Sequence, residues 1–244
     1  MKISDQPRVS EACQECRKSN PTTFCSFPDA VFADLQPLKI CRRYPRGCAL
    51  YMEGQPAKGV YLLCSGKVKL STYSEEGRAI ILRIAEPGEI LGLSAVISGT
   101  YYEKTAQASD DCTASFIKKK DFLDFLGTHH DAALSALQQL SSNYQKAHLQ
   151  ICSLGLSSSV GDKLARLLLQ WYDRSANGGP VRISRNHTHG EIAEMIGTSR
   201  ETVTRLLKDF RDRGLITLSK TEMCIPDRKS LKAAIGGKHG NGHT

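Results

Sequence analysis

The stretch "THGEIAEMIGTSRETVTRLLKDFRDRGLITL", residues 188–218, decides the fold of the C-terminal part of the chain. Thr188 can cap the start of a helix, and Glu191, three residues later, completes a capping box. Residues 197–199, Gly-Thr-Ser, predict a tight turn, after which a second helix runs until Gly214 ends it. Two short helices joined by a turn that contains glycine indicate a helix-turn-helix motif.

The second helix of this motif carries polar side chains on its leading face. When such a helix enters the major groove of DNA, an arginine can donate two hydrogen bonds to guanine and a glutamate can accept one from cytosine. The strand-like residues 215–227, which follow the helix, predict a wing. We therefore predict a DNA-binding surface that contains Ser199, Arg200, Glu201, Thr204 and Arg205.

A long helical pattern precedes the motif, at about residues 131–157. Its apolar positions are Leu137, Leu140, Tyr144, Ala147, Ile151 and Leu154. Their alternating steps of three and four residues form a narrow seam with polar flanks, which predicts a parallel homodimer of two such helices. The alternative is that this seam packs against the chain's own domain.

The N-terminal half has the pattern of a β protein. Alternating runs at 59–73 and 79–92 are rich in Val, Ile, Leu and Tyr, and glycines separate them. Short strands with a turn every ten or so residues predict a β-roll, barrel or sandwich. Residues 29–38 ahead of the strands have the pattern of a short amphipathic helix.

Composition limits the function classes. The net charge of +8 and pI near 9.0 over 244 residues suit a polyanionic partner. No run approaches about 18 apolar residues, and the N-terminus lacks the apolar core of a secretory signal, so we expect a cytoplasmic protein without membrane segments. The chain lacks the common catalytic motifs, such as a phosphate-binding loop or Gly-x-Ser-x-Gly, and we predict that it is not an enzyme.

Residues 192–216, "IAEMIGTSRETVTRLLKDFRDRGLI", closely resemble the recognition segment of the Crp/Fnr family of regulators. The resemblance extends over about residues 30–235 and implies an α+β fold. That fold has an N-terminal β-roll of the cyclic-nucleotide-binding, jelly-roll type, a long dimerisation helix and a C-terminal winged helix-turn-helix. It implies a regulator that binds double-stranded palindromic DNA as a homodimer and contacts RNA polymerase.

The sequence SRETVTR, residues 199–205, is similar to the catabolite-activator type of recognition helix. This likeness implies that Arg200, Glu201 and Arg205 contact bases, that Ser199 and Thr202 contact phosphates, and that the half-site is TGTGA-like.

The effector region departs from that type. By resemblance, a catabolite activator holds the ribose of a cyclic nucleotide with a glutamate and its phosphate with an Arg-Ser pair. This chain has Leu93 at the first position and Lys104-Thr105 at the second. Leucine cannot bond a ribose, and lysine offers a point charge in place of the two-pronged guanidinium. We therefore expect a different signal, although a cyclic nucleotide or another small effector in the roll remains the alternative.

Three cysteines near the N-terminus supply a candidate sensor. Nine cysteines in a chain expected to be reduced make structural disulfides improbable as a general explanation. Cys13, Cys16 and Cys25 resemble the cysteines of the fumarate–nitrate branch, which hold an oxygen-labile [4Fe-4S] cluster, although eight residues separate the second and third instead of five. By this resemblance Cys112 is the predicted fourth ligand, with Cys41, Cys48 and Cys64 as other candidates.

The expected mechanism is that the intact cluster favours dimer pairing and DNA binding, and that oxygen or nitric oxide destroys it. A zinc site or a thiol–disulfide switch at the same cysteines stays open. The predicted domains are 1–28 (cysteine-bearing sensor segment), 29–128 (β-roll), 129–157 (dimerisation helix), 158–235 (winged helix-turn-helix) and 236–244 (disordered tail).

Overall fold

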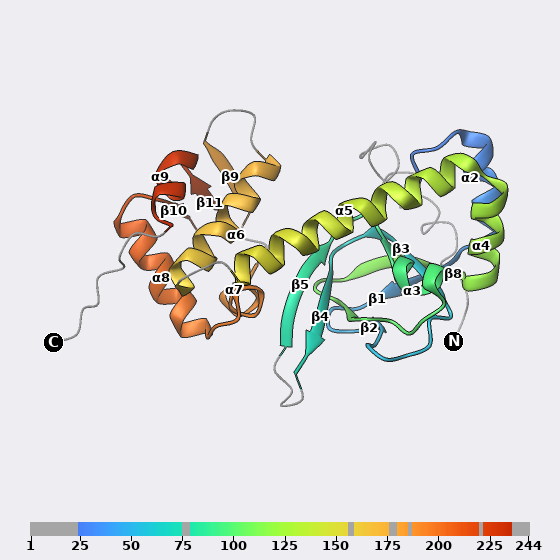
Figure 1. Cartoon of the computed structure of the whole chain (residues 1–244), viewed down its shortest axis with the longest axis horizontal. Helices are drawn as coiled ribbons and strands as arrows, with labels where there is room; N and C mark the ends of the chain where they lie inside the picture. The colour runs from blue at the N-terminus through green and yellow to red at the C-terminus, as the bar shows by residue number, and fades with distance from the viewer. Residues whose placement is uncertain are drawn as a thin grey trace. The chain divides into compact units, whose positions relative to one another are not determined.

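The computed structural model describes residues 24–74, 79–155, 159–175, 180–184, 187–219 and 222–235 (Figure 1). Cys13, Cys16 and the tail 236–244 lie outside these ranges. The chain divides into two compact units, Met1–Lys146 and Ala147–Thr244. The boundary lies inside one long helix, α5 (His130–Gly155), so the predicted dimerisation segment 129–157 contributes to both units.

The first unit is a β-roll with short helices at its ends. Its helical elements are α2 (Asp29–Leu35), η1 (Gln36–Leu38), α3 (Leu93–Ser98), α4 (Lys119–Thr128) and the first part of α5. Its strands are β1 (Ile40–Tyr44), β2 (Ala49–Tyr51), β3 (Gly59–Ser65), β4 (Val68–Tyr73), β5 (Ala79–Ala85), β6 (Ile90–Leu91), β7 (Thr105–Ala108) and β8 (Cys112–Lys118). They form two antiparallel sheets of order β1-β8-β3-β6 and β2-β7-β4-β5.

Aromatic side chains identify the face on which the two sheets meet. Tyr61 of β3 lies 5.5 Å from Tyr51 of β2, measured between ring centroids, and 5.0 Å from Phe116 of β8. Because neighbouring residues of a strand point to opposite faces, Leu62 and Ser115 lie on the other face of the first sheet. Both are buried, and α4 packs against β3 and β8.

The segment ahead of α2 belongs to the core of the roll. Phe24 and Phe27 are buried, and their rings lie 6.0 Å and 6.1 Å from Phe122 and Phe125 of α4. Cys25, between them in the chain, is also buried. Residues 24–28, which we assigned to a polar sensor segment, therefore pack as part of the first unit.

One buried hydrogen bond closes the roll beside Gly59. The hydroxyl of Tyr102 donates to the Gly59 carbonyl at 2.6 Å, and the Tyr102 ring stacks on Tyr51 with centroids 4.0 Å apart. Burial raises the pKa of Tyr102 to about 12, so the hydroxyl remains a donor throughout the neutral range.

We expect Tyr102→Phe to lower the free energy of unfolding by about 1–3 kcal/mol, because it removes a buried hydrogen bond to the Gly59 carbonyl. Urea unfolding at constant pH measures the difference. Tyr101→Phe is the matched control: Tyr101 is 62% exposed, and we expect a change within about 0.5 kcal/mol. Equal stability of the two variants would show that the hydroxyl contributes nothing.

The second unit is a winged helix-turn-helix. Its helices are α6 (Val160–Ser175), α7 (His189–Ile196), α8 (Arg200–Asp212) and α9 (Arg228–Ala233). The strands β9 (Val181–Ser184), β10 (Thr217–Leu218) and β11 (Glu222–Ile225) form a sheet of order β10-β11-β9. Its buried residues include Leu164, Leu168, Ile196, Val203 and Phe210. The Arg228 guanidinium of α9 binds the Asp173 carboxylate of α6 at 2.7 Å and 3.0 Å.

These observations confirm the predicted fold class, a β-roll followed by a long helix and a C-terminal winged helix-turn-helix. In the described part of the chain, no helix combines the length and the apolar character that crossing a bilayer requires.

Candidate functional site

The helix-turn-helix is built by side-chain caps that the sequence places at both helix starts. The Thr188 hydroxyl accepts from the Glu191 amide at 3.2 Å, and the Glu191 carboxylate accepts from the Thr188 amide at 2.8 Å. Gly197, with φ of +66°, ends α7 in the left-handed conformation that favours glycine. The Ser199 hydroxyl then accepts from the Thr202 amide at 3.2 Å and starts α8.

The two faces of α8 differ sharply. Val203, Leu207 and Phe210 are buried against the rest of the unit, so the opposite face is held outward. Exposed on that face are Arg200, Glu201, Thr204, Arg205 and Lys208. Among the described residues, no ion pair involves Arg200, Glu201 or Arg205. The charged atoms of these three side chains are therefore available to a partner.

Thr204 has a second role that the sequence did not indicate. Its hydroxyl donates to the Arg200 carbonyl at 2.9 Å and lies 2.8 Å from Nδ1 of His189, the first residue of α7. The hydroxyl therefore connects the two helices of the motif. Its predicted contact with DNA stays a prediction, and His189 was not among the predicted site residues.

The strands after α8 form a short hairpin next to the motif. The Ser219 amide donates to the Glu222 carbonyl at 2.8 Å, and the Glu222 amide donates to the Ser219 hydroxyl at 2.9 Å. These bonds connect Ser219, directly after β10, with the first residue of β11, and the two strands form the wing that the sequence predicts.

Comparison with known proteins agrees with this architecture. Residues 41–129 match the family model of a cyclic nucleotide-binding domain, and residues 162–234 match that of a Crp-like helix-turn-helix domain. The global nitrogen regulator of Synechococcus elongatus is 30% identical over 193 residues, which cover 78% of this chain and 86% of that protein. This chain belongs to the Crp/Fnr family.

Other members of the Crp/Fnr family are similar over most of their length. A CRP-like cAMP-activated global transcriptional regulator of Mycobacterium tuberculosis is 28% identical over 209 residues, 84% of this chain and 91% of that protein. FixK2 from Bradyrhizobium japonicum superposes with a TM-score of 0.69 at 22% identity and covers 81% of this chain and 97% of that chain. The chain is accordingly a DNA-binding transcriptional regulator of a family that acts as dimers.

In the effector region of the roll, the position expected to contact a ribose carries an apolar side chain. Leu93, at the start of α3, is buried in the core. Lys104 is partly buried, and burial lowers the pKa of its ammonium group, while the neighbouring Glu103 carboxylate acts in the opposite direction. This region therefore offers two partly desolvated cations, Lys104 and Arg83, and no carboxylate at position 93.

Helix α5 has two apolar faces. Ala132, Ala136 and Leu140 pack against the core of the roll, as the alternative interpretation of the seam proposed. A second face is exposed, and its residues also follow each other in alternating steps of three and four. Its apolar residues are Leu134, Leu137, Tyr144 and Ile151, and the polar residues Ser141 and His148 lie between them. Of the predicted interface, Leu137, Tyr144, Ile151 and Ala147 are thus exposed, whereas Leu140 packs on its own domain and the side chain of Leu154 lies outside the described residues.

The structure places the two described cysteines of the predicted cluster site in different surroundings. Cys112 pairs with Tyr44 across the sheet, on the face that meets the second sheet. Burial, together with the nearby carboxylates of Asp110 and Asp111, raises the pKa of its thiol to about 11. Cys112 is therefore held as a neutral thiol.

Cys25 lies near the end of β3 instead. The amide of Phe24 donates to the Gly88 carbonyl at 3.0 Å, and the Gly88 amide donates to the Leu63 carbonyl at 2.7 Å. Cys25 and Cys64 each directly follow one of these bonded residues, Phe24 and Leu63. The backbone hydrogen bonds from Phe24 through Gly88 to Leu63 thus join the two segments that contain Cys25 and Cys64.

A buried serine gathers two thiols on the outer face of the first sheet. The Ser115 hydroxyl lies 2.8 Å from the Cys41 sulfur and 3.5 Å from the Cys64 sulfur. Within the described ranges, no three His, Cys, Asp or Glu side chains come together as a metal site. A complete site would need Cys13 and Cys16, which lie outside those ranges.

Proposed function

We propose that this regulator reads TGTGA-like half-sites of a palindrome with the exposed end of α8. The observation that carries the proposal is the outward face of Arg200, Glu201 and Arg205, whose charged groups have no ion-pair partner among the described residues. Two copies paired through α5 would present two recognition helices one turn of DNA apart, about 34 Å. RNA polymerase is the further partner that we infer for the DNA-bound dimer.

Binding to two palindromes that differ only in their half-sites tests this proposal. We expect fluorescence anisotropy at fixed salt to give tighter binding to a TGTGA palindrome than to a TTGAT palindrome. Equal affinity for both would overturn the assigned half-site and leave only non-specific DNA binding.

We further propose that Cys13, Cys16 and Cys25 hold an iron–sulfur cluster, [4Fe-4S], that controls dimer pairing. When bound, such a cluster supplies an oxygen-sensitive link through soft thiolate ligands. The burial of Cys25 between Phe24 and Phe27 supports the proposal, because a group held by Cys25 would be anchored to the core of the roll. Loss of that anchor would release the N-terminal segment and disfavour the DNA-binding dimer.

Protein isolated without air provides the direct test. We expect iron and acid-labile sulfide in stoichiometric amounts, visible absorbance, and operator binding that falls when air is admitted. Colourless protein that holds stoichiometric zinc would instead establish the zinc alternative, and air-dependent disulfides in metal-free protein would establish the thiol switch.

The surroundings of the roll cysteines favour Cys64 over Cys112 as the fourth ligand. A metal ligand must be a thiolate, and the buried, acidic surroundings of Cys112 oppose that form. Cys64 directly follows Leu63, which hydrogen bonds through Gly88 link to Phe24, and its thiol donates to the Leu62 carbonyl at 3.5 Å and lies 3.5 Å from the Ser115 hydroxyl. We therefore propose Cys64 in place of the predicted Cys112.

Two matched variants separate these ligands. We expect Cys64→Ala protein, prepared without air, to lose most of its iron, and Cys112→Ala protein to keep it. Circular dichroism checks that both variants are folded, since both cysteines are buried. Iron loss in Cys112→Ala with full iron in Cys64→Ala would restore the original assignment.

An effector bound in the roll is the second candidate, because residues 41–129 match a cyclic nucleotide-binding domain. The buried apolar Leu93 argues against recognition of a ribose hydroxyl. Calorimetric titration with cyclic AMP distinguishes the two proposals: we expect no heat of binding, and a saturable signal would favour the effector.

A further inference from the structure

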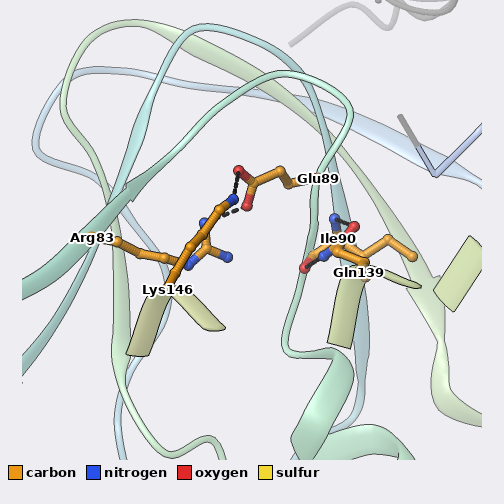
Figure 2. Close-up of polar contacts among 5 residues, drawn as sticks. All are labelled: Arg83, Glu89, Ile90, Gln139 and Lys146. Carbon is orange, nitrogen blue, oxygen red and sulfur yellow. Dashed lines mark hydrogen bonds and ion pairs between the residues drawn. The ribbon is translucent and has the colours of Figure 1, made fainter. Parts of the chain in front are cut away.

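A carboxylate on the roll pairs with two cations, one from the roll and one from α5. Figure 2 shows the Arg83 and Lys146 side chains, from β5 and α5, both reaching the Glu89 carboxylate. The Arg83 guanidinium pairs with one carboxylate oxygen of Glu89, and the Lys146 ammonium lies 3.4 Å from the other. The side chains of Arg83 and Glu89 are only 15% and 17% exposed, so water screens this pair weakly.

A side-chain amide makes a second link between the same elements. The Ile90 amide donates to Oε1 of Gln139 at 2.9 Å, and Nε2 of Gln139 donates to the Ile90 carbonyl at 2.7 Å (Figure 2). Ile90 belongs to β6, the edge strand of its sheet. Gln139 thus satisfies both backbone groups of an edge residue, as a neighbouring strand would.

These two links lie on one stripe of α5. Gln139 and Lys146 are seven residues apart, two helical turns, on the side that also packs Ala132, Ala136 and Leu140 on the roll. The opposite stripe, which contains Leu137 and Tyr144, is exposed. The polar links and the apolar contacts therefore hold the same side of α5 on the roll.

The links also lie next to the effector region. Ile90 is two residues before Gly92 and three before Leu93, the position at which the resemblance places the ribose contact. In this chain, residues of the protein itself join α5 to that part of the roll. A small molecule is not needed to complete the contacts described above.

We propose that Glu89 and Gln139 form a latch that holds α5 on the roll without an effector. The latch (Arg83, Glu89, Ile90, Gln139 and Lys146) keeps the exposed apolar stripe of α5 turned outward, toward a second copy of the chain. Its contacts lie within the first unit and do not involve the proposed cluster ligands, so the proposal does not depend on a metal.

Hydrogen exchange of the α5 amides tests the latch. We expect Gln139→Ala to speed exchange in residues 137–146 by about tenfold, because two hydrogen bonds that oppose local opening are lost. Gln138→Ala is the matched control, since Gln138 is its exposed neighbour on the same helix. The amides of β8, in the core of the roll, serve as the internal reference for overall stability.

Lys146→Met tests the ionic half of the latch in the same way. Its control is Lys120→Met, which removes an exposed ion pair with Asp124 within α4. We expect faster α5 exchange and at least about fivefold weaker operator binding for Lys146→Met, and neither change for Lys120→Met. We also expect cyclic AMP not to restore binding.

Two results would overturn the proposal. One is α5 exchange in both latch variants that equals that of their controls. The other is restoration of α5 protection or operator binding by a cyclic nucleotide, which would mean that an effector closes this site. Metal-free protein serves for the exchange measurement, so failure of the iron–sulfur proposal would leave this test intact.

Discussion

Replacement of Arg200 and Arg205 with alanine is expected to weaken binding to a TGTGA palindrome by at least about thirtyfold, because each two-pronged contact with guanine contributes about 1–3 kcal/mol. Both side chains extend from the exposed face of α8 without an ion pair among the described residues. Their removal therefore breaks no ion pair among the described residues, and we expect the variant to remain folded. Anisotropy titrations at fixed salt measure the change.

Arg211→Ala provides the control for this double substitution. Arg211 lies in the last turn of α8, where its guanidinium pairs with Asp212 at 2.8 Å, far along the helix from the N-terminal end. We expect its affinity for the palindrome to stay within about threefold of the wild-type value. If Arg211→Ala weakened binding as much as the double variant, net charge and not base recognition would account for the effect.

Replacement of Cys25 with serine is expected to remove nearly all iron and sulfide from protein prepared without air. Cys25 is anchored in the core of the roll, beside Phe24 and Phe27. A serine hydroxyl is a hard donor and replaces a soft thiolate poorly. Operator binding by this variant is expected to equal that of air-exposed wild-type protein and to be unaffected by air.

Cys224→Ser is the control for the cysteine prediction, because Cys224 lies in β11 of the second unit. This variant is expected to keep its iron and its response to air. Iron content in Cys25→Ser equal to that of the wild type would exclude Cys25 as a ligand. Unchanged, air-independent operator binding by metal-free wild-type protein would leave a DNA-binding dimer with a different signal.

Local chemistry made the second unit predictable. The capping box of Thr188 and Glu191, the glycine at position 197 and the cap at Ser199 each act within a few residues, and all three are present in the structure. The same holds for the buried face of α8, because helical periodicity determines which side chains share a face. Strand patterns likewise indicated a β-roll, barrel or sandwich, and the structure has the two antiparallel sheets of a roll.

Local sequence patterns did not predict which face of α5 or of β8 each side chain occupies. The repeat in α5 could not separate Leu140, which packs on the roll, from Leu137, which is exposed, because both fit one seam of alternating steps. Cys112 and Ser115 lie three residues apart on β8, and the pairing of that strand turns them to opposite faces of the sheet.

The sequence by itself determined the order of the elements, the caps and turns of the DNA-binding unit, and the charged residues at the start of α8. Only the tertiary structure decided that Gly88 links Phe24 to Leu63 of β3, that Thr204 bonds His189, and that Glu89 and Gln139 contact α5 and β6 across the roll. The physical reason is the sequence separation of the residues that interact. Caps and periodicity act between residues a few positions apart, whereas Glu89 meets Lys146 across 57 positions, and strand pairing and helix packing alone bring such residues together.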